Sequence, residues 1–90
     1  MAGTVFFITA HSNAPQVEER LSTFISENDM FKLRPDEWMV TFEGAARDLA
    51  EKAGIRGGDE RIGTGLVLPV TTYSGRAATE LWDWLREKGL

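Results

Sequence analysis

The sequence predicts a single α+β domain over residues 1–90, an antiparallel sheet with helices on one face and a further helix at the C-terminus. Three observations lead to this prediction. Hydrophobic residues make up 42% of the chain and charged residues 27%, an ordinary globular mixture whose length suffices for one modest core. Four stretches are rich in β-branched and aromatic residues, as strands are. Between and after them, apolar residues recur at helical spacing.

The first strand and the first helix are predicted near the N-terminus. Residues 4–9 (TVFFIT) form a continuous β-branched and aromatic run, typical of a central strand covered on both faces. A helix is expected over residues 15–26, with Pro15 in its first turn and Ser12 or Asn13 as its cap. Its apolar face would contain Val17, Leu21, Phe24 and Ile25.

A hairpin and a second helix should follow. Residues 30–34 and 37–42 both have strand character, and Pro35 and Asp36 between them favour a turn. Alternation in the second of these strands places Trp38, Val40 and Phe42 on one face of the sheet. Residues 44–53 change to helical spacing, and Gly54 is a natural C-terminal cap. The apolar stripe of this helix would contain Ala46, Leu49, Ala50 and Ala53.

The last part of the chain predicts a loop, a strand and a helix. Residues 55–64 hold three glycines and four charged residues and are expected to form a mobile surface loop. Residues 66–72 resume the strand pattern, and Pro69 favours an edge position or a bulge because proline cannot donate a ladder hydrogen bond. Thr79 should cap a final helix over residues 80–88, which Gly89 ends.

These elements follow the order β-α-β-β-α-β with an added C-terminal helix. This is the split β-α-β, ferredoxin-like arrangement, in which both main helices lie on one face of the sheet. The opposite face must then be solvated, covered by the final helix, or buried against a second copy of the chain.

Composition limits the chemistry. The chain has no cysteine, which excludes a disulfide framework, a thiolate metal site and a thiol nucleophile. The apolar run at residues 5–8 is far shorter than the roughly 20 residues that span a bilayer, and no basic leader precedes it, so we expect a cytoplasmic protein without a membrane segment. The net charge of −4 disfavours nucleic acid as a partner. No motif for a cofactor or a metal occurs, and we expect neither.

Three segments resemble a known superfamily. They are TVFFITAH at the start, EWMVTFEGAARDLAEK in the middle, and GTGLVLPVTTYSGRA followed by LWDWL at the end. Over nearly the whole chain, their order is similar to that of short uncharacterised bacterial proteins in the ferredoxin-like superfamily that includes the small CRISPR-associated integration subunit and antitoxin endoribonucleases. The resemblance implies this fold.

For the nuclease members, the same resemblance implies a dimer and a divalent metal. The metal is held by an acidic residue at or just after the end of the first strand. The matching residues 9–13 (TAHSN) contain no carboxylate here, which argues against metal-dependent cleavage.

Two places in the sequence offer candidate binding residues. Tyr73, Ser74 and Arg76 form the densest polar cluster after a strand, and arginine is suited to bidentate contact with an anion. The structural alternative is that Arg76 pairs with Glu43 while Tyr73 fixes the bend. His11, the only histidine, follows a strand end, where acid and base residues are often displayed, but no base or nucleophile adjoins it.

The three tryptophans, Trp38, Trp82 and Trp84, are the candidate interface residues. They could stack on nucleic-acid bases, but such platforms normally lie in a basic groove, and acidic residues surround these tryptophans in the sequence. Core packing or a dimer interface is the better interpretation, because aromatic anchors dominate both.

The leading hypothesis is therefore a small noncatalytic ferredoxin-like protein that acts by protein–protein interaction, as a homodimer through its open sheet face or its terminal helix. The alternative is a nucleic-acid-binding protein or a weak metal-dependent endoribonuclease of the CRISPR-associated or antitoxin type, using residues 73–76 together with Arg56 and Arg61. A small-ligand pocket between sheet and helices is a third hypothesis, for which no particular residue argues.

Overall fold

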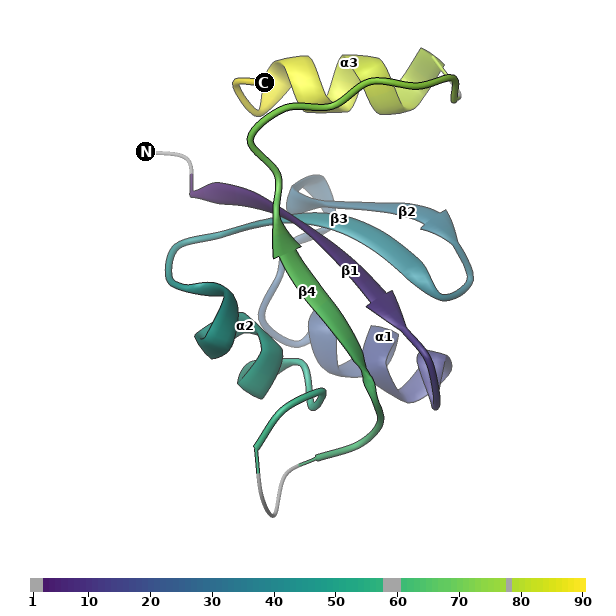
Figure 1. Cartoon of the computed structure of the whole chain (residues 1–90), viewed down its shortest axis with the longest axis vertical. Coiled ribbons are helices and arrows are strands. Elements are labelled where there is room, and N and C mark those ends of the chain that lie inside the picture. The colour runs from purple at the N-terminus through teal and green to yellow at the C-terminus, as the bar shows by residue number, and fades with distance from the viewer. Residues whose placement is uncertain (1–2, 58–60, 78) are drawn as a thin grey trace.

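The computed structural model describes residues 3–57, 61–77 and 79–90. Within these residues it has one four-stranded sheet and three α-helices (Figure 1). The strands are β1 (Thr4–Ala10), β2 (Met30–Arg34), β3 (Glu37–Phe42) and β4 (Gly65–Pro69). The helices are α1 (Ala14–Ser22), α2 (Ala46–Lys52) and α3 (Thr79–Glu87), and a 3₁₀ turn, η1 (Glu27–Asp29), precedes β2. No described helix combines the length and the apolar character needed to cross a bilayer.

The sheet has the strand order β2-β3-β1-β4, and every neighbouring pair is antiparallel. β1 lies inside the sheet, as its continuous apolar run predicts, and residues of α1 and α2 pack into one core on the same face of it. β2 and β3 form the predicted hairpin around Pro35 and Asp36. The predicted α+β class with an antiparallel sheet is therefore confirmed.

β4 is an edge strand, which confirms the position that Pro69 predicts. The Val70 N–H donates to the Val5 carbonyl oxygen at 2.8 Å, so the backbone groups of Val70 face β1. Because these groups alternate along a strand, those of Pro69 face away from β1, and its missing N–H removes no ladder bond. The strand ends at Pro69, short of the predicted residue 72.

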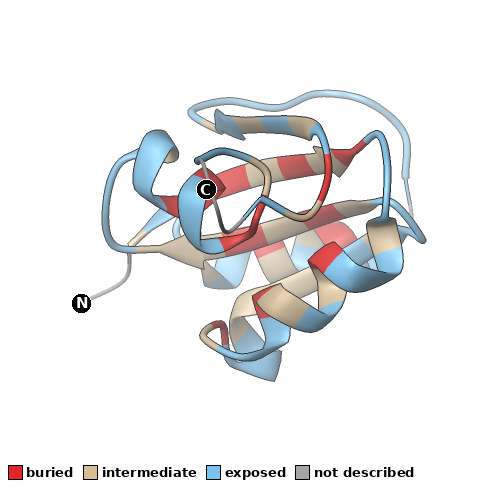
Figure 2. Ribbon diagram, turned by 90° about the horizontal axis from the view of Figure 1, so that it is seen from below, coloured by how far each residue is buried: buried red, intermediate tan, exposed pale blue. Residues whose placement is uncertain are grey.

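The main core lies between the sheet and the helices α1 and α2. Buried residues alternate along β3 (Figure 2), which places Trp38 and Val40 on the predicted face. The buried members of this core are Phe6, Ile8, Ala10, Val17, Leu21, Ile25, Trp38, Val40, Leu49 and Ala53. Trp38 is 0% exposed, and its indole Nε1–H has no hydrogen-bond partner among the described residues. Of the two roles left open for Trp38, the structure shows core packing.

The C-terminal helix α3 packs on the opposite face of the sheet. Its buried residues Leu81 and Leu85 form a second, smaller core with Val5, whose neighbour Phe6 belongs to the main core. Partly buried residues around this second core are Phe31, Leu33, Met39, Val70, Trp82, Trp84 and Leu90. The sequence analysis left this face to solvent, to the final helix or to a second copy of the chain. In the structure the final helix covers part of it.

α1 differs from its prediction at both ends. It ends at Ser22 because the Thr23 hydroxyl and amide both donate to the Arg20 carbonyl oxygen and close the last turn early. Asn13 occupies the N-cap position, with φ 55° and ψ 41°, but its side chain makes no capping hydrogen bond. The predicted side-chain cap is therefore wrong.

The side chains expected to cap α1 are bonded to the segment before β4 instead. Asn13 Nδ2 donates to the Ile62 carbonyl oxygen at 2.7 Å. Ser12 Oγ accepts from the Thr64 N–H at 3.0 Å and lies 3.1 Å from Thr64 Oγ1. These contacts satisfy the polar groups of two chain segments at once, and they hold the start of β4 against the end of β1.

The connection from α2 to β4 is bonded in the same way where the structure describes it. α2 is shorter than the predicted 44–53, and Gly54 follows it with a φ of 83°, a conformation that favours glycine. The N–H groups of Ile62 and Gly63 both donate to the Gly54 carbonyl oxygen, at 2.6 and 3.2 Å. Of the loop predicted to be mobile, residues 58–60 lie outside the described residues.

Replacing Trp38 with Phe should change the free energy of unfolding by no more than about 1 kcal/mol. Phenylalanine loses packing volume, but it also removes a buried N–H whose missing hydrogen bond costs about 1–3 kcal/mol. Leu49→Ala in the same core is the control and should cost about 2–5 kcal/mol. Urea unfolding followed by far-UV circular dichroism measures both. Equal losses in the two variants would contradict an unsatisfied donor in the wild type.

Candidate functional site

Tyr73, from the predicted binding cluster, stacks on α3. The Tyr73 and Trp82 ring centroids lie 5.5 Å apart with the ring planes 14° from parallel. The Tyr73 hydroxyl donates to the Leu90 carbonyl oxygen at 3.5 Å. A cavity of about 400 Å³ lies beside this stack and is lined by Tyr73, Ser74, Gly75, Thr79, Trp82 and Arg86. Tyr73 thus fixes the bend to the helix, as the structural alternative predicts.

Arg76 does not complete that cavity. It is exposed, does not line the cavity, and forms no ion pair with a described residue, so the predicted pair with Glu43 is absent. The cavity has an arginine in Arg86, but this guanidinium already pairs with Asp83 at 2.6 Å. That carboxylate would repel an anion beside it, which disfavours the bend as an anion site.

His11 lies at the end of β1 with its side chain exposed. Its backbone N–H donates to the Thr64 carbonyl oxygen at 2.7 Å, while its imidazole makes no hydrogen bond or ion pair with a described residue. The neighbouring Ser12 hydroxyl is occupied by Thr64. Within the described residues, the surroundings of His11 therefore join chain segments and do not form an acid–base pair.

The two halves of the predicted nucleic-acid site are not brought together. Arg56 and Arg61 lie in the connection before Gly65, where β4 begins, whereas residues 73–76 follow Pro69, where β4 ends. Figure 1 shows these two segments at opposite ends of β4. A single binding surface cannot use both without spanning the length of the strand.

Trp84 is anchored where α3 meets η1 and β2. Its Nε1–H donates to the Asn28 carbonyl oxygen at 3.1 Å, and its ring centroid lies 6.1 Å from that of Phe31. Lys88 Nζ lies 5.6 Å from the same ring. The half-buried indole therefore holds the final helix in place through three different contacts.

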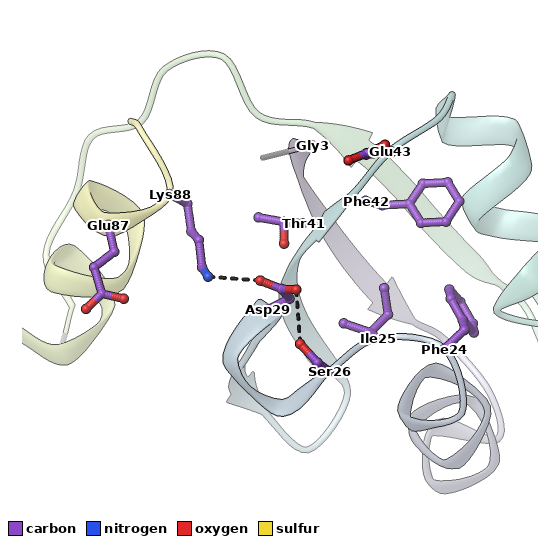
Figure 3. Close-up of a pocket in the computed structure, with 10 residues that line it drawn as sticks. All are labelled: Gly3, Phe24, Ile25, Ser26, Asp29, Thr41, Phe42, Glu43, Glu87 and Lys88. Carbon is purple, nitrogen blue, oxygen red and sulfur yellow. Dashed lines mark hydrogen bonds and ion pairs between the residues drawn. The ribbon is translucent and has the colours of Figure 1, made fainter. Parts of the chain in front are cut away.

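A cavity of about 450 Å³ lies where the end of α3 approaches η1 and the end of β3 (Figure 3). Asp29 lies between two donors there. Lys88 Nζ donates to one carboxylate oxygen at 2.9 Å and Ser26 Oγ to the other at 3.0 Å. Glu43, Glu87 and Thr41 also line the cavity. Among the described residues, no group of three or more side chains with metal-ligating atoms is placed to hold a metal ion.

The charges at this cavity indicate a structural role. The hydrogen bond from Lys88, followed by that from Ser26, lowers the pKa of the Asp29 carboxyl below its ordinary value. Both oxygens of that carboxylate are already occupied, and the Lys88 side chain is only 15% exposed. The pair fastens the end of the chain to the turn before β2, so Asp29 serves to hold these two segments together.

An apolar patch that the sequence analysis did not single out lies on β1 and β4. Leu66 and Leu68 are 51% and 47% exposed. In the sheet register Phe7 is paired with Leu68 on one side and with Met39 on the other, so these side chains share one face. α3 covers this face around Val5 and leaves the region near β4 open. We call Phe7, Leu66 and Leu68 the open-face patch.

Comparisons of this chain with protein-family models, curated proteins and solved structures found no match. Its function must therefore be argued from the geometry of the chain itself.

Asp29→Asn should lower the Tm at pH 7 and leave it unchanged near pH 2. The folded-state pKa of Asp29 lies below the ordinary 3.8, so the carboxylate stabilises the fold above pH 3.8, and this contribution is lost as the pH falls through the lower folded-state pKa. Because the side chain is 45% exposed, we expect less than about 1 kcal/mol, or a few degrees in Tm.

Thermal unfolding followed by circular dichroism at a series of pH values measures this difference. Glu27→Gln is the matched control, because Glu27 belongs to the same turn, is exposed and forms no ion pair with a described residue. A Tm difference for Asp29→Asn that does not vary with pH would contradict the proposed pairing with Lys88.

Proposed function

We propose that this chain is a noncatalytic ferredoxin-like domain that acts by protein–protein contact and self-associates through the open-face patch. The exposure of Leu66 and Leu68, 51% and 47%, is the observation that carries the proposal. Side chains two residues apart in a strand lie on the same face, so the two leucines form one continuous apolar surface with Phe7.

The sheet supports the ferredoxin-like part of the proposal. Its order β2-β3-β1-β4, its antiparallel neighbours and its two helices on one face agree with a split β-α-β arrangement. In such a two-layer domain the second sheet face is free to receive a further layer. α3 supplies that layer over Val5 and Met39, and a second copy of the chain would supply it over the open-face patch.

The size of the patch sets the expected strength of the contact. A fully buried leucine contributes roughly 1.5–3 kcal/mol, so burying the exposed half of one contributes about 1 kcal/mol. Two leucines from each copy then give about 4 kcal/mol, against an association cost of at least about 4 kcal/mol. Because these two terms nearly cancel, Phe7 must add to the contact, and we expect a weak dimer rather than an obligate one.

The residues after β1 support a noncatalytic role. In the superfamily that the sequence resembles, the nuclease members use this place for a metal-binding carboxylate. Here the side chains of Ser12 and Asn13 bond to Thr64 and Ile62 and hold the start of β4. Changing them for catalysis would remove these hydrogen bonds.

The alternative, nucleic-acid binding or weak endoribonuclease activity, is less well supported. It requires residues 73–76 to act with Arg56 and Arg61, and these segments lie at opposite ends of β4. The net charge of −4 also opposes contact with a phosphate backbone.

Leu68→Glu should convert a dimer of this chain into a monomer. A carboxylate placed in a dry apolar contact must be desolvated in both copies, which should raise the Kd at least tenfold, equivalent to about 1.4 kcal/mol. Sedimentation velocity over a concentration series up to high micromolar measures the change. The fold should be retained, because Leu68 is 47% exposed in the single chain.

Gln16→Glu is the control, because it adds the same charge at an exposed position on α1, on the other face of the sheet. A wild-type chain that remains monomeric throughout the series would refute self-association. Equal weakening by Gln16→Glu and Leu68→Glu would indicate an effect of net charge and contradict the open-face patch as the contact.

A further inference from the structure

A cavity of about 520 Å³ lies between α2 and the start of β4, and three arginines line it. Arg47 comes from the first turn of α2, Arg56 from the residues after this helix, and Arg61 from the segment leading into β4. The fold brings these three separate segments around one space. We call it the arginine cavity.

Within the part of the chain that the structure describes, little negative charge faces the positive charge of this cavity. None of its described lining residues is acidic. Arg47 and Arg61 form no ion pair with a described residue, and Arg56 only approaches Glu51, at 3.8 Å between side chains that are both at least half exposed. Such an exposed pair contributes little. Like charges around one space repel each other, so an anion bound there would relieve that repulsion.

The chemistry of the guanidinium group selects the kind of anion. It stays charged at all physiological pH values, and its planar fork of donors matches two oxygens of a phosphate or carboxylate. Several arginines converging on one ligand fit a phosphate group better, since it offers more acceptor oxygens than a carboxylate does.

The size and the remaining walls of the cavity favour a small molecule over a polymer. Pockets for small ligands usually measure about 300–1,000 Å³, so about 520 Å³ lies within that range. Ala50, Ile55 and Val67 supply apolar wall next to the arginines. A polynucleotide would also meet the negative field of a chain with a net charge of −4, whereas a small ligand needs only the local charge.

We propose that the arginine cavity binds a small organic phosphate, with the phosphate group held by Arg47, Arg56 and Arg61 and the organic part against Ile55 and Val67. This site shares only Leu66 with the open-face patch proposed for self-association. Leu68 does not line the cavity, although Leu66 borders both surfaces. The two proposals can therefore fail independently.

The test is a titration of the ¹⁵N-labelled full chain with inorganic phosphate, adenosine monophosphate and adenosine, in a buffer free of phosphate. Adenosine monophosphate should shift the backbone amide signals of Ile55, Gly57 and Val67, inorganic phosphate should shift them less, and adenosine alone should leave them unchanged. Arg47→Gln and Arg61→Gln should each raise the Kd about tenfold, because each removes a charge-assisted contact to the phosphate.

Arg34→Gln is the matched control, since Arg34 is exposed on β2 at the other edge of the sheet and its loss should leave the Kd unchanged. Repeating the titration on Leu68→Glu separates ligand binding from self-association, and that variant should bind with the wild-type Kd. Absence of shifts with both phosphates, or an equal loss of affinity in Arg34→Gln, would overturn the proposal. Binding shown only by a single-stranded oligonucleotide, and abolished by salt, would overturn it in favour of a polynucleotide.

Discussion

The alternation of side chains along β1 is the constraint on which the rest of the structure depends. β1 lies between β3 and β4, and its successive residues Val5 and Phe6 are buried in different cores. One core holds α1 and α2 against the sheet, and the other holds α3. A shift of one residue in the register of β1 would exchange the two sets of contacts, so the packing of both cores specifies this register. Two helical layers are therefore positioned by a single strand.

The same strand explains why one end of the sheet is firmly bonded. The chain leaves β1 through Ser12 and Asn13, whose side chains bond to the residues that lead into β4. Gly54 accepts two N–H groups from that same leading segment. The end of α2, the start of β4 and the end of β1 thus share one hydrogen-bond network. The arginine cavity is lined partly by segments that this network holds.

Local patterns in the sequence predicted the strands well, because alternation and turn residues act over few residues. Such patterns predicted the hairpin at Pro35 and the edge position of Pro69. They also predicted that Trp38 and Met39 lie on different faces of the sheet. The side of the sheet that α3 covers could not be predicted, since Leu81 and Leu85 suit either face. The arginine cavity could not be predicted either, because its arginines come from three separate segments that only the fold brings together. Leu66 and Leu68 alternate with Val67 in the sequence, but their exposure could not be predicted because it depends on how much of the sheet α3 covers.

The lysines differ from Arg47 and Arg61 in the contacts that they make. All three lysines have structural contacts: Lys32 pairs with Glu18 and Lys88 with Asp29, each at 2.9 Å, and Lys52 lies 5.6 Å from the Phe24 ring centroid. Arg47 and Arg61 have no such ion pairs within the described residues, yet they line one cavity. In a chain with a net charge of −4, acidic partners for arginine are not scarce. Since none of the described lining residues is acidic, the gathered arginines repel one another, and an anion from outside would relieve that repulsion.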